Sequence, residues 1–220
     1  MGPDNWIHLG LIFGYGVVIW LLWRTPVLFP FKLITIYIHE MGHAVAGWAS
    51  GATVHGISVN ANEGGVTRLT GGKMWMILPA GYLGSAFFGS ALVLLGTGKF
   101  TSFIAAGVLI ACLLVSLRWV ENVLTVALTL GFIAGIALLW YFQNGRFLPY
   151  LINFIGTMSA LYAIYDVYDD TIRRHVPQSD AALLAERTPI PAVAWGVIWC
   201  LFSVGMLVGA LYLGIKLKLG

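Results

Sequence analysis

Long apolar runs are the feature of this chain that most restricts its fold. Seven runs have about 20 residues each, the length that crosses a bilayer as a helix: residues 6–23, 27–50, 74–96, 100–117, 122–142, 147–167 and 192–214. Only 10% of the 220 residues are charged, against about 25% in soluble domains. The first two runs are joined by only a few residues. The sequence therefore predicts an all-α polytopic membrane protein with six to seven transmembrane helices, in a single domain over residues 1–220.

Two longer polar stretches interrupt the apolar runs. In residues 51–73, two short alternating runs flank Asn62-Glu63-Gly64-Gly65, a pattern that predicts a β-hairpin after the second apolar run. Residues 169–191 are expected to form a charged surface loop. Within that loop, Ser179 and Asp180 precede an Ala- and Leu-rich segment, which predicts a short capped helix at the surface.

The charges exclude one class of partner and leave orientation open. The net charge is +3, with no basic run, so nucleic acid is not an expected partner. Lys and Arg divide six to six between the two sides of a seven-span arrangement, so the positive-inside rule does not decide the sidedness. The sequence predicts contact with a lipid bilayer, without indicating which membrane or oligomeric state.

The second apolar run contains the sequence His39-Glu40-Met41-Gly42-His43, an HExxH pattern. Positions i and i+4 share one face of a helix, so His39 and His43 can bind one metal ion. Glu40, beside them, can act as general base toward a water molecule that the metal makes more acidic. Ionisable side chains at membrane depth are costly, and their presence there indicates a functional site.

A catalytic zinc ion usually has three protein ligands, so a third ligand is expected at membrane depth. Among nine acidic residues, only Asp166 besides the HExxH glutamate lies clearly inside an apolar run. The second and sixth runs cross in the same direction, and the two motifs differ in depth by roughly one helical turn. Asp166 is therefore the predicted third ligand, with Asp169 and Asp170 as alternatives. Asp166 has two other readings, as a helix cap or as an ion-pair partner of Arg173 or Arg174.

These residues resemble the site-2 protease family of intramembrane zinc metallopeptidases. The resemblance implies that His39 and His43 bind Zn²⁺ and that Glu40 is the general base. It places the hairpin residues Gly64, Gly65, Val66 and Thr67 near a substrate. The segment from Ala80 to Ser85 falls where many members have a Gly-Pro-x-x-Asn type segment.

The chain departs from the best-known members of that family in its acidic motif. Those members carry the third ligand in an Asp-Gly motif, which is absent here, and Asp166-Val167-Tyr168-Asp169-Asp170 takes its place. The chain therefore resembles a compact branch of the family with an Asp-x-x-Asp-Asp motif.

The preferred function is a zinc-dependent endopeptidase that cleaves transmembrane or membrane-proximal segments of other membrane proteins. One alternative is a membrane metal-binding or transport protein in which HExxH is a transit site. The other is a catalytically inactive scaffold, against which the intact Glu40 argues, because a pure binder needs no carboxylate there.

Overall fold

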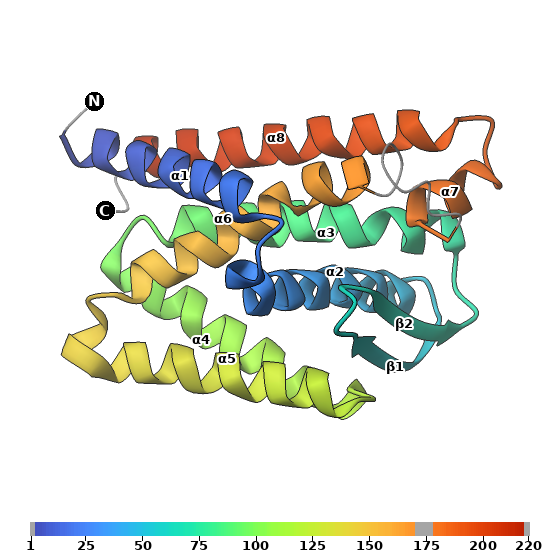
Figure 1. Ribbon diagram of the computed structural model, residues 1–220, viewed down its shortest axis with the longest axis horizontal. Coiled ribbons are helices and arrows are strands. Elements are labelled where there is room, and N and C mark those ends of the chain that lie inside the picture. The colour runs from blue at the N-terminus through green and yellow to red at the C-terminus, as the bar shows by residue number, and fades with distance from the viewer. Residues whose placement is uncertain (1–2, 170–177, 218–220) are drawn as a thin grey trace.

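The computed structural model describes residues 3–169 and 178–217, which are mostly helical (Figure 1). The helices are α1 (Pro3–Leu22), α2 (Phe29–Ala49), α3 (Met74–Leu95), α4 (Lys99–Ser116), α5 (Val123–Tyr141), α6 (Leu148–Val167), α7 (Asp180–Ala185) and α8 (Ala192–Leu217). The strands are β1 (Thr53–Val59) and β2 (Gly65–Thr70), which pair as an antiparallel hairpin. The expected helical fold and the hairpin after the HExxH helix are thus confirmed.

Five of the described helices are long and apolar enough to cross a membrane, namely α3, α4, α5, α6 and α8. The HExxH helix α2 is not among them, and its four ionisable side chains lower its hydropathy. The expected count of six to seven spans is not confirmed. Figure 1 shows that α1 and α2 run in the same direction, one after the other, and that both termini lie at the same end. Seven alternating spans would place the termini at opposite ends.

Helix α3 packs against α2, α6 and α8. Glycines allow these close approaches: a Cβ atom on Gly42 of α2 would overlap the backbone carbonyl of Ala80 in α3. Likewise, a Cβ atom on Gly89 of α3 would overlap the backbone of α6 at Ala160. Small residues at helix interfaces stabilise bundles in membranes, where the hydrophobic effect does not drive helices together. These contacts hold the HExxH helix against the middle of the bundle.

Local sequence sets both ends of α2. Pro30 lies in its first turn, where the missing N–H removes no helical hydrogen bond. The helix ends at Ala49, and Gly51, two residues later, has a φ of +85°, the left-handed conformation that favours glycine. The Ala52 N–H then donates to the Gly47 carbonyl oxygen at 2.8 Å, which completes the C-terminal cap. The chain turns there directly into β1.

The two strands of the hairpin differ in how firmly they are attached. β1 is tied to the start of α5: the Val59 N–H donates to Thr125 Oγ1 at 2.8 Å, and Asn122 Nδ2 donates to the Val59 carbonyl oxygen at 2.9 Å. Ile57 and Val59 are fully buried. β2 pairs with β1 alone among the described strands. Its outer edge is therefore open for further pairing.

The short helix α7 lies within the predicted charged loop at residues 169–191. Its cap is as predicted, because Ser179 Oγ accepts a hydrogen bond from the Ala182 N–H at 3.3 Å. The helix is not a surface element, however. Ala181 and Leu184 are buried, and α7 packs against α3 and α8. Ala181 and Leu184 are three residues apart and share one face of α7, which is the face buried in the bundle.

Candidate metal centre

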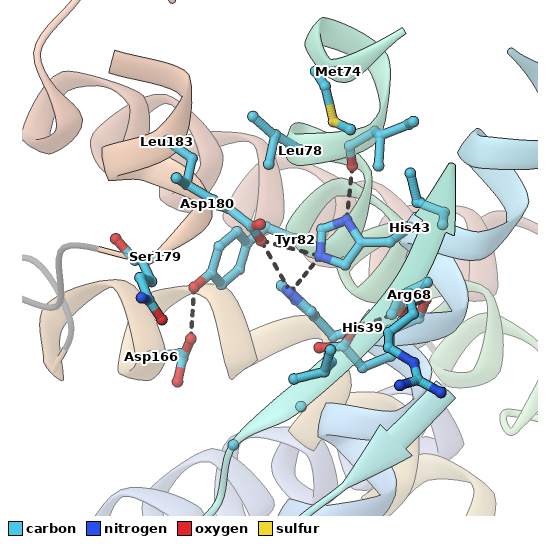
Figure 2. A pocket seen from close by; sticks show the side chains of 18 of the residues that line it. His39, His43, Arg68, Met74, Leu78, Tyr82, Asp166, Ser179, Asp180 and Leu183 are labelled. Carbon is cyan, nitrogen blue, oxygen red and sulfur yellow. Dashed lines mark hydrogen bonds and ion pairs between the residues drawn. The ribbon is translucent and has the colours of Figure 1, made fainter. Parts of the chain in front are cut away.

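Three side chains of the kind that bind metal ions meet inside the bundle: His39 and His43 of α2 and Asp180 of α7. The two Nε2 atoms are 3.0 Å apart, and each lies 3.1 Å from Asp180 Oδ2. Both imidazoles are buried, and the Asp180 side chain is 15% exposed. Figure 2 shows the three groups pointing toward one point between α2 and α7. Two imidazoles at i and i+4 thus meet a carboxylate from 141 residues further along the chain than His39.

The two histidines are oriented by different means. His43 Nδ1 lies 2.7 Å from the Ile77 carbonyl oxygen, so it carries the proton and donates it, which leaves Nε2 free to bind a metal. His39 Nδ1 has no hydrogen-bond partner in the part of the chain that the structure describes. Its ring is instead held by edge contacts with Tyr82 and Tyr162, at centroid separations of 4.5 and 5.4 Å. Aromatic packing replaces the usual hydrogen bond at this ligand.

Asp180 is the first residue of α7, directly after the Ser179 cap. A negative charge is favoured at this end of a helix. Burial raises the pKa of its carboxyl, but protonated imidazoles facing it through Nε2, the position that a metal ion would take instead of the proton, outweigh burial and hold the pKa well below its usual range. Asp180 is therefore ionised at neutral pH, as a metal ligand must be.

The donor set fits a catalytic zinc ion. Zinc is commonly bound by imidazole nitrogen and carboxylate oxygen, with three protein ligands and one open position. Ligand atoms about 2.0 Å from a tetrahedral ion are about 3.3 Å from one another. The separations of 3.0 and 3.1 Å among the three atoms are close to that value.

Glu40 is held beside this group by the hairpin. The Thr67 hydroxyl lies 2.6 Å from Glu40 Oε2 and 2.9 Å from the Glu40 carbonyl oxygen, so it can donate its proton to either. A Cβ atom on Gly65 would overlap the Glu40 carboxylate, so only glycine lets β2 come this close. The carboxylate is thus fixed between the HExxH helix and the open strand.

A cavity of about 1240 Å³ opens onto these groups. The hairpin lines one side, and Met74, Leu78 and Leu183 give the opposite side an apolar surface (Figure 2). The cavity is large enough for several residues of an extended peptide. Polar side chains also line the cavity away from these groups, among them Asn62, Arg68 and Asp166.

A family model described as Peptidase M50B-like matches residues 12–210. The chain belongs to the Peptidase M50B-like family. This membership confirms the resemblance to site-2 proteases, and peptidases of this family are zinc-dependent. Together with the five apolar helices, it makes the protein an integral, multi-pass membrane protein. Neither a curated protein nor a solved structure matches the chain.

The acidic residue at the histidines of this M50B-like protein differs from the one expected from the sequence. Asp166 lies on the far side of the Tyr82 ring and accepts a hydrogen bond from the Tyr82 hydroxyl at 2.6 Å (Figure 2). Asp169 does not reach the histidines: its Oδ1 atom lies 3.9 Å from Arg24 Nη2. Asp170 lies outside the described residues. Acids outside the apolar runs were not expected near the histidines, whereas α7 packs in the bundle and brings Asp180 to them. The Ser179 cap predicted that a short helix begins there, but it did not predict that this helix packs inside the bundle.

The hairpin residues expected near a substrate lie at the cavity. Gly64, Gly65, Val66 and Thr67 all line it, and the last of them contacts Glu40 directly. Their role in binding a substrate stays a prediction.

Gly81 of α3 lies against both imidazoles, and a Cβ atom there would overlap His39 and His43 near their Nε2 atoms. We expect Gly81→Ala to weaken zinc binding by about 10- to 100-fold, the range seen when the surroundings of metal ligands are disturbed. Competition with a chromophoric chelator would measure this affinity. Gly131→Ala is the matched control, because its Cβ atom would meet nothing within 4 Å. Equal zinc affinity in the two variants would contradict this placement of α3.

Proposed function

We propose that the protein is a zinc-dependent intramembrane endopeptidase that cleaves transmembrane or membrane-proximal segments of other membrane proteins. The observation that carries the proposal is the position of Glu40, fixed by Thr67 beside the group of His39, His43 and Asp180. A site that only bound or transported metal would not need a carboxylate held next to the ligands and facing a cavity of this size.

His39, His43 and Asp180 would hold the zinc ion. Zinc supplies Lewis acidity, which makes a water molecule more acidic and polarises the carbonyl group of a peptide bond. Glu40 accepts the proton of the attacking water and delivers it to the leaving amine. The Thr67 hydrogen bond orients the Glu40 carboxylate for both transfers.

The open edge of β2 supports a peptide rather than a metal ion as the substrate. A transmembrane helix hides its peptide bonds in its own hydrogen bonds, so a substrate segment must unwind before it is cleaved. An unwound segment can then pair with the edge of β2 by β-augmentation, with Gly64 to Thr67 beside it. Pairing there places the segment next to Glu40.

The order of the helices supports an even number of crossings. We infer that α1 and α2, which run in the same direction, together make one interrupted crossing. With α3, α4, α5, α6 and α8, this gives six crossings, within the range expected from the sequence.

Removal of the metal distinguishes a zinc-dependent peptidase from a metal transporter and from an inactive scaffold. In proteoliposomes, we expect a chelator to reduce cleavage of a labelled single-span substrate to the background rate, and added zinc to restore it. The same vesicles, loaded with a zinc-sensitive dye, would report zinc flux. Flux without cleavage would support the transport alternative, and neither activity would support the inactive scaffold.

A further inference from the structure

A buried lysine lies in the first turn of α2, away from the metal centre. Lys32 is 6% exposed. Burial of an ammonium group is costly, and the N-terminal end of a helix carries a partial positive charge that disfavours a cation. Such a position is stable only if the charge has close partners.

Lys32 has two such partners, and each belongs to a different part of the molecule. Its Nζ atom donates to Glu63 Oε1 at 2.5 Å, in the turn of the hairpin. The same atom lies 5.5 Å from the centre of the Trp23 ring, just after α1. Trp23 in turn stacks on Tyr165 of α6, at 4.5 Å between ring centres. Lys32 therefore ties the hairpin turn to the helical bundle.

Glu63 is held in a conformation that a glutamate rarely adopts. Its φ is +63°, in the left-handed region. A side chain persists there only when its surroundings favour it, and the ion pair with Lys32 supplies that interaction. Two residues further along, Gly65 lies against the Glu40 carboxylate. The position of the turn thus decides where β2 meets the general base.

On its outer side, β2 has few other attachments. β1 is fixed to α5 through Val59, whereas the side-chain bonds from the turn and β2 to α2 are those of Glu63 with Lys32 and of Thr67 with Glu40. Arg68 of β2 also pairs with Glu121, just before α5, but release of the Glu63 bond would leave Thr67 as the only side chain of the described hairpin bonded to α2.

We propose that Lys32 and Glu63 are a positioning pair that holds β2 against Glu40 and so sets how a peptide is presented for cleavage. The kinetic consequence rests on the proposed function, whereas the structural consequence does not. Neither side chain takes part in the chemistry.

Hydrogen–deuterium exchange of the full-length protein in nanodiscs tests the structural consequence. The double variant Lys32→Met/Glu63→Gln removes both charges, so it leaves no buried ion without a partner. We expect the β2 amides to exchange about 10- to 100-fold faster, the effect of losing one charge-assisted hydrogen bond. The Val59 amide of β1, which donates to Thr125 of α5, and the amides of α3 should exchange as in the wild type. Lys73→Met is the matched control, because Lys73 is exposed at the other end of β2.

Two exchange results would overturn the proposal. Unchanged exchange in β2 would show that the pair does not hold the strand. Faster exchange throughout α3 and α6 would show that the pair stabilises the whole bundle. A wild-type protein that cleaves no peptide would refute the proposed function, but the exchange result would still decide the role of the pair.

Steady-state kinetics test the second consequence. We expect Lys32→Met to raise KM for a membrane-protein substrate more than it lowers kcat, with zinc content unchanged, because the chemical groups stay in place. Lys32→Arg keeps the charge and should restore KM to near the wild-type value. A fall in kcat alone, or no rescue by arginine, would contradict a positioning role.

Discussion

We expect Glu40→Gln to lower the rate of peptide cleavage by about 10²- to 10⁴-fold, the usual contribution of a general base. Glutamine keeps the shape of the side chain and can still accept a hydrogen bond from Thr67, but it cannot take a proton from water. Because Glu40 is not one of the three ligand residues, the zinc content should not change. Cleavage of a labelled membrane substrate and metal analysis of the same preparation would measure both quantities.

Glu186→Gln is the matched control for this prediction. It makes the same substitution at a carboxylate whose side chain is 67% exposed, and it should leave cleavage at the wild-type rate. Substantial cleavage by the Glu40→Gln variant would contradict the proposed mechanism. Loss of zinc from that variant would instead assign Glu40 to the ligands.

The second large effect is expected at Asp180. Asp180→Asn keeps the size of the side chain but removes the charge that faces both imidazoles at 3.1 Å. We expect zinc affinity to fall by more than about 100-fold, beyond the 10- to 100-fold loss typical of residues that only orient a ligand. Cleavage should be lost in parallel. Competition with a chelator of known affinity would measure the change.

Asp166→Asn distinguishes this assignment from the one expected from the sequence. Asp166 lines the same cavity, but its carboxylate binds the Tyr82 hydroxyl. The Asn variant should therefore keep its zinc, with at most the smaller loss caused by a displaced Tyr82 ring beside His39. The opposite result, with zinc lost at Asp166 and kept at Asp180, would return the third ligand to α6.

The sequence predicted those parts of the site whose geometry is set by residues close together in the chain. His39, Glu40 and His43 share a face because of helical periodicity, and the hairpin follows from its alternating pattern and its Asn/Gly-rich turn. Asp180 could not be found in this way. Its place depends on how α7 packs on α3 and α8, which no local pattern encodes.

The direction of α2 relative to α1 could not be predicted from the sequence either. Apolar length identifies a segment that can enter a bilayer, but it does not show whether the chain reverses between two such segments. Between α1 and α2, the chain passes through a short 3-10 turn, Pro26–Leu28, and then continues in the same direction. Seven alternating spans require the chain to reverse at this break, whereas six do not, so the sequence left the number at six to seven.

The position of Asp180 would give a bound zinc ion a second effect, on the stability of the fold. A bound ion would join α2 to α7 across 141 residues, as a crosslink that closes a very long loop. Closing such a loop removes many conformations from the unfolded chain, so the ion would stabilise the fold in addition to any role in chemistry. Zinc occupancy and the docking of α7 are therefore thermodynamically linked. If zinc binds as proposed, a fall in free zinc would weaken the packing of α7 on α3 and α8 and lower the cleavage rate together.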